Sequence, residues 1–292
     1  MLTFEIGNRD HGRRFESFLR GHLPASPSGY ARKLIKSGAA TRLGTPATAD
    51  SFLLLHDIVT LKESGTTLSY LSTAPPPLDV LFEDGLLLIA NKPSGMPMHR
   101  TAELGDNLVD GAIQAMEQRG TPCKLYPVNR LDRGTSGAVI LAKSSRAAGI
   151  FGRQVKETGL DKLYLALVRG IPAESGIITT PLDGKESETR YRTLLSGSQG
   201  SLLAVTPISG RMHQIRRHLS AIGHPIIGDK RYDGGELADC AGFALHSFRT
   251  ALTLTETERM TVYAPITDEF AELCVKSGIT GDELLASLAG LM

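Results

Sequence analysis

Three consecutive prolines, Pro75-Pro76-Pro77, interrupt the chain early in its 292 residues. Proline fixes φ and has no backbone N–H to donate, so a run of three continues neither a helix nor a central strand and favours an extended spacer. The hydrophobic pattern changes at the same point. We therefore predict two domains, a small one at residues 1–74 and a larger one at residues 75–292.

The smaller domain is predicted to contain two helices followed by short strands. Residues 13–23 place their apolar side chains on one face of an amphipathic helix, and residues 26–38 indicate a second helix with serines at its start. The second helix carries the basic residues Arg32 and Lys33. The strand-like pieces that follow end with residues 52–61.

The larger domain is rich in strands. Residues 78–93 predict a hairpin, because two apolar runs flank a short acidic turn that ends in glycine. Further helices are predicted at 107–120, 144–159 and 213–223, and further strands at 162–170, 201–209 and 243–256, the last as one strand or a pair. Strands and helices do not alternate regularly, which predicts an α+β domain with a mixed or antiparallel sheet.

The composition is that of a globular protein from a reducing compartment. Hydrophobic residues make up 41% of the chain and charged residues 22%. The start has no basic segment followed by an apolar one, and no apolar run approaches the roughly 18 residues of a membrane helix. The three cysteines, Cys123, Cys240 and Cys274, are too few and too far apart for a disulfide framework or a cysteine zinc site. We expect a cytoplasmic protein that contacts no membrane.

Charge is distributed unevenly along the chain. The net charge is +1, but residues 234–292 hold nine acidic and three basic residues, a balance of −6, which leaves +7 for the rest. A basic face on most of the molecule fits an RNA partner. The modest excess indicates selective binding rather than a purely electrostatic grip.

The stretch NRLDRGTSG (129–137) places Asp132 between Arg130 and Arg133, just before a glycine-containing turn and an apolar run. An aspartate with a pKa of about 3.9 is ionised at pH 7 without help. The flanking guanidiniums therefore matter only in a dry pocket, where an unpaired carboxylate is costly. Such an anion suits a nucleophile in a closed site. The alternative is a rim salt bridge worth under about 1 kcal/mol.

Residues in two further stretches have either a catalytic or a structural role. Tyr164, in the strand at 162–170, is either a platform for a base or a core tyrosine. Arg216 and Arg217 are adjacent on a predicted helix, where their directions differ by about 100°. Arg216 can therefore point inward, as a buried cation with Asp132 as a candidate partner, or both arginines are solvated.

The basic residues of the remaining motifs also allow two interpretations. His213 and His218 are five residues apart, which does not fit the i, i+4 spacing of helical zinc ligands, and no acidic ligand lies close by. We therefore expect no metal site. Lys92 lies in a loop rich in proline and glycine, which either contacts phosphate or forms a stiff connection.

Taken together, these motifs resemble the RluA-type family of RNA pseudouridine synthases, in order from about residue 78 to residue 270. The motifs are NKPSG (91–95), NRLDRGTSG (129–137), Lys-x-Tyr-x-Ala-x-Val-x-Gly (162–170), ETRYRTL (188–194), GRMHQIR (210–216) and GHPIIGD (223–229). Residues 1–74 resemble the RNA-binding domain named after ribosomal small-subunit protein four. The resemblance implies a long, mixed, mostly antiparallel sheet with the site in a cleft across its middle.

The resemblance also implies a reaction and its residues. The expected enzyme detaches uracil from its ribose, turns the ring and rejoins it through a carbon, as a monomer without cofactor or metal. Asp132 corresponds to the nucleophile, Tyr164 to the residue that stacks on the base, and Arg216 to the basic partner of the aspartate. Arg130 is expected to help displace the base from its stack. The residues expected to bind the RNA are Arg130, Arg211, His213 and Lys92 in the larger domain and Arg32 and Lys33 in the smaller one.

One position departs from the family pattern, because Asn129 stands where the family has histidine. The change leaves Asp132 intact, and could alter a hydrogen bond in the Arg130 loop or the choice of RNA. The RNA itself is expected to be ribosomal or transfer RNA. Two other readings stay open: a non-catalytic RNA-binding or ribosome-assembly protein on the same fold, and a carboxylate-based hydrolase, which needs a second acid or a metal.

Overall fold

The computed structural model of the protein describes residues 1–7, 10–23, 26, 29–71, 78–99, 107–157, 160–235, 237, 242–254 and 258–292. The chain forms two compact units, one of Met1–Pro77 with His99–Gly111, the other of Leu78–Met98 with Ala112–Met292. The predicted spacer Pro75-Pro76-Pro77 lies outside the described residues, as do Arg9, Arg100 and Cys240. The sequence did not indicate that His99–Gly111 belongs with the first unit.

The smaller unit is a three-stranded antiparallel sheet with helices. Its strand order is β1–β3–β2, with β1 at Leu2–Glu5, β2 at Ala40–Arg42 and β3 at Ile58–Leu61. The helices are α1 (Phe15–His22), α2 (Tyr30–Lys36) and α3 (Gly65–Tyr70). Buried side chains of α1 and α2, such as Phe18 and Ile35, share one apolar cluster with Val59 of β3.

Both predicted helices of this unit are confirmed, but two details of the prediction are wrong. The residue at the start of α2 is Gly29, in the left-handed backbone region, and no side chain caps the helix, so the expected serine cap is absent there. Within residues 52–61 only β3 is a regular strand. Phe52 and Leu54 lie exposed before it, because an apolar run alone does not distinguish a strand from a loop.

The larger unit is built on a ten-stranded sheet. Its order is β4–β5–β7–β12–β8–β11–β10–β9, with β13 paired to β12 and β6 paired to β7. The strands are β4 (Val80–Glu83), β5 (Leu87–Lys92), β6 (Tyr126–Pro127), β7 (Ser136–Ala142), β8 (Asp161–Arg169), β9 (Ser175–Ile178), β10 (Thr189–Ser196), β11 (Gly200–Pro207), β12 (Leu245–Thr253) and β13 (Arg259–Tyr263). Within the described residues, β7 and β12 are the one parallel pair. The α+β prediction with a mixed, mostly antiparallel sheet is confirmed.

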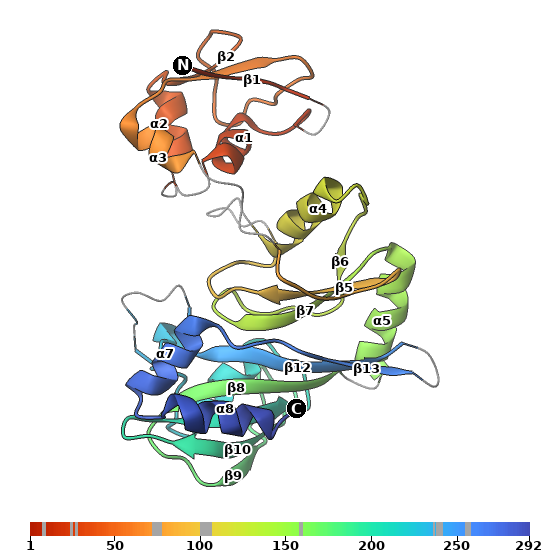
Figure 1. The fold of residues 1–292 in the computed structure, drawn as a ribbon, viewed down its shortest axis with the longest axis vertical. Coiled ribbons are helices and arrows are strands. Elements are labelled where there is room, and N and C mark those ends of the chain that lie inside the picture. Colours follow the sequence, from red (N-terminus) through yellow and green to blue (C-terminus); the bar gives the residue numbers. More distant parts are fainter. Residues whose placement is uncertain are drawn as a thin grey trace. The chain divides into compact units, whose positions relative to one another are not determined.

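Helices flank this sheet, as Figure 1 shows. They are α4 (Leu108–Gln118), α5 (Ser145–Glu157), α6 (Gln214–Ala221), the 3-10 turn η1 (Lys230–Tyr232), α7 (Asp268–Lys276) and α8 (Gly281–Ala289). Phe151 of α5 packs into a buried cluster with Ile89 of β5 and Ile140 of β7. The sequence prediction missed β9, β13, α7 and α8. No helix in the described ranges is long and apolar enough to cross a membrane.

The central strands are buried on both faces. Every residue of β7 is buried, and so are Leu163 to Val168 of β8, so apolar side chains run continuously instead of alternating with polar ones. Strands covered on both sides show this pattern. It places Tyr164 in the interior of the sheet, between Val205 of β11 and Ser247 of β12.

Two contacts fix the start of β7, directly after the motif that contains Asp132. Gly137 has φ +106, and a Cβ atom there would lie 2.4 Å from the carbonyl oxygen of Ser247. The neighbouring Ser136 hydroxyl lies 2.9 Å from Nδ1 of His246, whose Nε2–H donates to the Ala264 carbonyl at 3.1 Å. Burial lowers the pKa of His246 to about 4, so its ring is neutral and accepts from Ser136. The Asp132 loop is therefore anchored to β12.

We predict opposite stability changes for two glycine substitutions. Gly137→Ala should lower the free energy of unfolding by about 2–3 kcal/mol, because it adds left-handed strain and a clash with a backbone carbonyl. Gly149→Ala should raise it by about 0.5–1 kcal/mol, because Gly149 lies in α5 with open space around its Cα. Denaturant unfolding of both variants measures the two changes. A Gly137→Ala protein as stable as the wild type would contradict the close approach of β7 and β12.

Candidate active site

The Asp132 carboxylate lies in the loop between β6 and β7, with 22% of its side chain exposed. Its Oδ2 atom accepts a hydrogen bond from Nη1 of Arg216 at 2.8 Å and lies 3.8 Å from Nε2 of His213. Its Oδ1 atom accepts no hydrogen bond from the described part of the chain. Among the described residues, the carboxylate is thus held through Oδ2 alone.

Arg216 is a buried cation on α6 with two carboxylate partners. Besides Asp132, its Nε and Nη2 groups donate to Asp229 at 2.6 Å and 2.9 Å, and the guanidinium lies over the rings of Phe243 and Tyr232, 4.3 Å and 4.9 Å from their centroids. Burial opposes the charge, but hydrogen bonds to Asp229 and then Asp132 outweigh it and raise the pKa of Arg216. The prediction of an inward Arg216 paired with Asp132 is confirmed.

The neighbouring Arg217 points the other way. Its guanidinium pairs with the exposed Asp183 through contacts of 2.9 Å and 3.1 Å. Two adjacent arginines thus make similar ion pairs, one in the interior beside Asp132 and one at the surface. The 100° step between consecutive helical residues produces this separation.

The arginines that flank Asp132 in sequence do not pair with it, so the rim salt bridge that the sequence allowed is absent, and their role in a closed pocket stays a prediction. Arg133 is exposed and donates to the Gly95 carbonyl at 3.1 Å, and Arg130 is exposed. An ion pair in that setting would add little. The positive charge beside Asp132 is that of Arg216, which lies 84 residues further along the chain.

Tyr164 is enclosed near the carboxylate. It is 7% exposed, and burial raises the pKa of its phenol to about 12, with the charge of Asp132 acting in the same direction. The phenol is therefore protonated at neutral pH. The interpretation of Tyr164 as a core tyrosine is confirmed by its place in the sheet interior, and its role as a platform for a base stays a prediction.

His213 has an unusual backbone at the start of α6, with φ 53 and ψ 28. Its Nδ1 atom lies 2.9 Å from the Tyr232 hydroxyl. Burial is the main cause that lowers the pKa of His213, against the opposing effect of Asp132, so the imidazole is neutral around pH 7. Left-handed conformations of non-glycine residues tend to mark functional sites, and this one turns His213 toward Asp132.

Gln214 fixes the loop that carries His213. Its Oε1 atom accepts hydrogen bonds from the Ser209 hydroxyl at 2.7 Å and the Arg211 amide at 3.0 Å. Its Nε2 group donates to the Glu188 carbonyl at 2.8 Å and the Thr189 hydroxyl at 3.0 Å. A buried amide with both ends satisfied makes this loop rigid.

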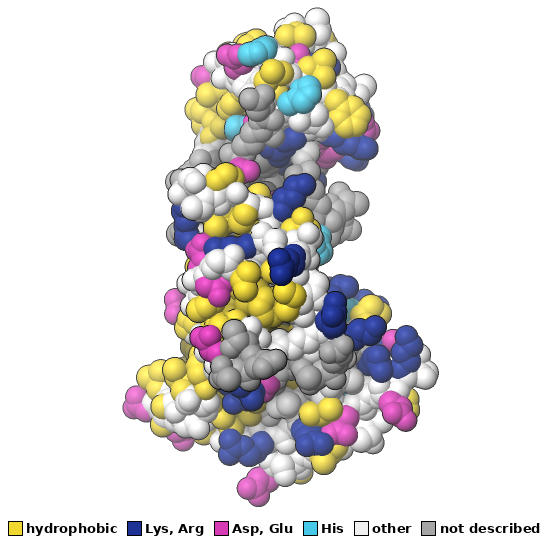
Figure 2. All heavy atoms as spheres, turned by 90° about the vertical axis from the view of Figure 1, so that its right-hand side faces the viewer, with side chains coloured by type: hydrophobic (Ala, Val, Ile, Leu, Met, Phe, Trp, Pro, Cys, Tyr) yellow, Lys and Arg dark blue, Asp and Glu magenta, His cyan; other side chains and the backbone are white. Residues whose placement is uncertain are grey.

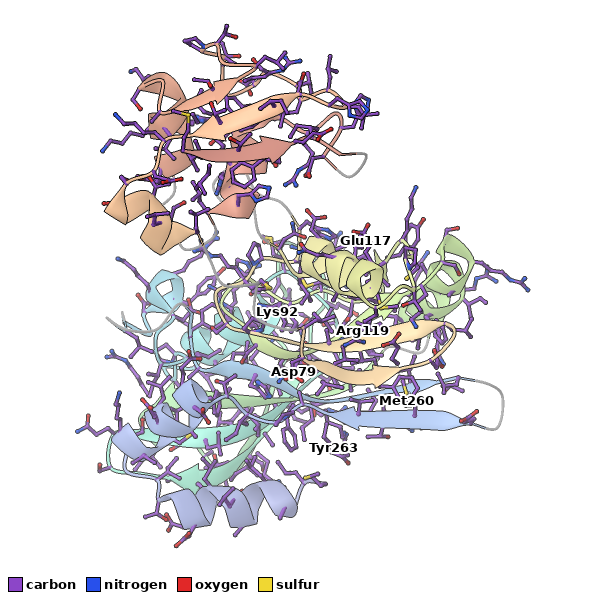
Figure 3. All side chains as sticks on the ribbon, turned by 45° about the horizontal axis from the view of Figure 1, so that its top comes forward. Asp79, Lys92, Glu117, Arg119, Met260 and Tyr263 are labelled. Atoms are coloured by element: carbon purple, nitrogen blue, oxygen red, sulfur yellow. The ribbon has the colours of Figure 1, made fainter. Side chains whose placement is uncertain are left out.

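Lys92 lies inside the larger unit, at the end of β5 (Figure 3). It is 0% exposed, and its ammonium donates to three backbone carbonyls, those of Pro93, Met96 and Arg133, at 2.8 to 3.1 Å. Burial lowers the pKa of Lys92 to about 7, and Asp132 opposes that shift. A side chain enclosed in this way offers no surface to a phosphate, which argues against the predicted substrate contact. Lys92 instead ties its own loop to the Asp132 loop.

The remaining predicted residues are spread over both units. Arg211 is exposed and donates to the Glu186 carbonyl at 3.1 Å. In the smaller unit, Arg32 pairs with Glu16 at 2.7 Å, and Lys33 is exposed. The Asn129 side chain accepts from the Ile140 amide at 2.8 Å, and its buried Nδ2 group has no partner among the described residues.

The second histidine of the predicted pair, His218, makes structural contacts. His218 binds the Thr180 carbonyl and the Thr189 hydroxyl, both at 2.9 Å, and is fully buried. Within the described residues no three His, Cys, Asp or Glu side chains gather in a way that could hold a metal ion.

Sequence reasoning missed three residues that shape the site. Asp229 entered only as the last residue of the GHPIIGD motif, and Tyr232 and Phe243 were not considered at all. A signal for Asp229 was available, because a guanidinium buried beside a partly exposed carboxylate needs a second anion. The GHPIIGD motif ends on one.

Comparison with known proteins agrees with this geometry. A profile of the RNA pseudouridylate synthase family matches residues 86–221. Proteins named ribosomal large subunit pseudouridine synthase C are similar to the chain: that of Vibrio cholerae is 32% identical over 76% of this chain and 77% of its own, and that of Escherichia coli is 30% identical over 77% of each. Solved structures share the fold, including human RNA pseudouridylate synthase domain containing 1, with a TM-score of 0.57 and 25% identity over 75% of this chain and 97% of that one.

The fold and the matching family profile thus define the class of the pseudouridylate synthases. More narrowly, this chain belongs to the RluA-type family of RNA pseudouridine synthases. It is an isomerase that converts uridine in RNA to pseudouridine.

We predict very different effects for the two adjacent arginines. Arg216→Ala should reduce turnover by at least about 100-fold and destabilise the fold by about 3–5 kcal/mol, because it leaves Asp229 buried without its cation. Arg217→Ala should cost under about 1 kcal/mol and leave turnover within about threefold, because its pair is at the surface. Pseudouridine formation and denaturant unfolding test both variants. Equal losses of turnover would contradict the assigned orientations.

Proposed function

We propose that this enzyme isomerises uridines in large-subunit ribosomal RNA, with Asp132 as the nucleophile that acts on a nucleotide flipped out of its stack. The observation that carries the proposal is the Asp132 carboxylate, held at 2.8 Å by the buried Arg216 through Oδ2 alone. The choice of RNA is supported by the names of the similar proteins, which refer to the large ribosomal subunit. Transfer RNA is the competing substrate.

The chemistry of an isomerisation suits such a site. The N1–C1′ bond of uridine breaks, a C5–C1′ bond forms, and the proton lost from C5 is balanced by one gained at N1. Nothing is oxidised or reduced, so no redox partner is required. The free Oδ1 atom of Asp132 is the atom that acts first in this proposal, since Oδ2 is occupied by Arg216.

Tyr164 and Arg130 have separate roles in the proposal. The Tyr164 ring supports the flipped uracil, and its protonated hydroxyl can donate but does not serve as a base in its resting state. Arg130 is exposed two residues before Asp132 and can enter the stack that the target base leaves. His213 is a neutral imidazole beside the same carboxylate and can contact the target nucleotide.

Exposed arginines without a carboxylate partner support an RNA surface around Asp132. Within the described ranges three of them are close in sequence to Asp132 or to His213, namely Arg130, Arg133 and Arg211, and a fourth, Arg231, adjoins Tyr232, which contacts His213. Such arginines also occur elsewhere among the described residues, at Arg146, Arg153, Arg169 and Arg192, whereas others pair with a carboxylate: Arg13, Arg14, Arg32, Arg42, Arg119, Arg190, Arg217, Arg249 and Arg259. Figure 2 shows lysine and arginine side chains gathered along one side of the larger unit. Cations without local anions are available to RNA phosphates.

The smaller unit is proposed to be a separate RNA-binding module that resembles ribosomal small-subunit protein four. The lysines of α2, Lys33 and Lys36, are exposed, and no carboxylate of the described residues pairs with them. Arg32 is engaged by Glu16, so its contribution to phosphate binding requires that pair to open. The lysines are therefore the stronger candidates.

We expect Asp132→Asn to abolish pseudouridine formation while leaving the fold and RNA affinity nearly unchanged, because the amide keeps the shape but is not a nucleophile. Pseudouridine is mapped in RNA from cells that lack the gene, after incubation with the wild type or the variant. Activity within tenfold of the wild type, with deamidation excluded by mass spectrometry, would falsify the role of Asp132. A wild-type enzyme that forms no pseudouridine would favour a non-catalytic RNA-binding protein, and modification of transfer RNA alone would overturn the proposed substrate.

The RNA-binding role of α2 is tested by salt titration. Lys33→Ala combined with Lys36→Ala should reduce the slope of log affinity against log salt by about 2, because each phosphate contact contributes about 0.9. The control variant combines Lys62→Ala with Lys276→Ala and removes the same amount of positive charge. Lys62 is exposed next to β3, and Lys276 lies in the acidic region at α7. If both double variants show the same slope, the α2 lysines do not contact RNA.

A further inference from the structure

We propose that Asp229 is a positioning residue for the isomerisation: it fixes the Arg216 guanidinium so that one N–H group reaches Asp132 and the Oδ1 atom of Asp132 stays free to react. This inference rests on the proposed function, because it takes Asp132 as the nucleophile. Asp229 binds the Arg216 cation, whereas the carboxylate that reacts in this proposal is that of Asp132.

The geometry assigns the two carboxylates unequal shares of Arg216. Asp229 accepts two hydrogen bonds, from Nε at 2.6 Å and from Nη2 at 2.9 Å, and Asp132 accepts one, from Nη1 at 2.8 Å. The paired, two-bond arrangement is the stronger way for a carboxylate to bind a guanidinium. In this site it belongs to Asp229, which is 1% exposed, and not to the residue at the reacting position.

This division matters for nucleophilicity. If the Nε and Nη2 edge of Arg216 were free, the guanidinium could turn and bind both oxygens of Asp132 in the same two-bond manner. A guanidinium bound to both oxygens of a carboxylate draws charge from each of them, so neither oxygen is as strong a nucleophile as one that accepts no hydrogen bond. By occupying that edge, Asp229 keeps the cation beside Asp132 while leaving Oδ1 exposed to a substrate.

The chain around Asp229 is constrained tightly enough to serve this purpose. The Asp229 amide donates to the Ile226 carbonyl at 3.0 Å, and the Asp229 carbonyl accepts from the amides of Tyr232 and Gly234 at 3.0 Å and 2.9 Å. A Cβ atom on Gly234 would lie only 1.8 Å from the Ile226 carbonyl oxygen, so the loop is too tightly packed to accept a side chain at this position. The backbone thus determines where the carboxylate lies.

The aromatic rings complete the support. Tyr232, in the same loop, and Phe243, just before β12, both lie over the guanidinium. Gly134, in the Asp132 loop, leaves room for the Phe243 ring, because a Cβ atom there would lie 2.5 Å from it. Asp229 and the two rings therefore hold Arg216 in place, and Asp132 binds it through a single hydrogen bond.

The test uses two variants of the full-length protein and the RNA that the wild type modifies. Asp229→Glu keeps the charge but moves the carboxylate by one methylene, and Asp229→Asn keeps the length but removes the charge. Both should reduce the single-turnover rate constant by about 100-fold, the size expected for a small misplacement of a catalytic group. The dissociation constant for RNA should stay within about threefold, because Asp229 is buried away from the surface. Asp183→Asn is the control, since Asp183 also binds its arginine, Arg217, through two hydrogen bonds but does so at the surface and through Nη1 and Nη2, and it should leave the rate unchanged.

A double-mutant cycle separates positioning from a general structural role. In the Arg216→Ala background, Asp229→Glu should slow the reaction by less than about threefold more, because the residue it acts through is gone. Additive losses, or a wild-type rate in Asp229→Glu, would overturn the proposal. If Asp229→Asn does not fold, the Glu variant and its cycle decide alone. An active Asp132→Asn protein would instead overturn the proposed function, whatever the Asp229 variants do.

Discussion

The buried guanidinium of Arg216 is the interaction on which the rest of the site depends. A cation taken out of water is tolerated only with anions and hydrogen bonds around it, and here these come from two aspartates that lie on separate loops. One ion therefore fixes three parts of the chain at once: helix α6, the Asp132 loop and the loop that ends in η1. The protein keeps a charged carboxylate at a half-buried position because the cation beside it is stabilised by a second acid.

A second buried basic side chain, Lys92, holds the other side of the Asp132 loop. The ammonium of Lys92 has carbonyl oxygens instead of carboxylates as partners, and one of them, from Arg133, belongs to the residue directly after Asp132. The Ser136–His246 contact and the close approach at Gly137 then join the end of that loop to β12. The loop is thus fixed at the residue after Asp132 and at the start of the following strand. Such support is what a reacting group needs to stay in a productive position.

Much of this arrangement could be predicted from the sequence, and the failures have physical causes. Long periodic segments such as residues 144–159 and 162–170 gave the right elements, and the angular step between Arg216 and Arg217 gave the right orientations. Arg216, on a helix far along the chain, was predicted correctly as the partner of Asp132, whereas the flanking Arg130 and Arg133 do not pair with it. Asp229 was missed because the pairing of buried charges depends on tertiary contacts that have no sequence period. Lys92 was misjudged because a lysine is seldom fully buried, and a motif does not reveal burial.

The parallel pairing of β7 with β12 has a consequence for how the enzyme folds during its synthesis. Ser136 and His246 are separated by 110 residues, so the contact that anchors the Asp132 loop is among the least local in the chain. Contacts of this kind form slowly, because a long segment must first be ordered between them. A ribosome that has completed β8 has already made Asp132 and Tyr164, but not Arg216, Asp229 or β12. During synthesis Asp132 therefore exists long before the residues that hold it, and the complete site forms only when the last strands of the sheet have joined.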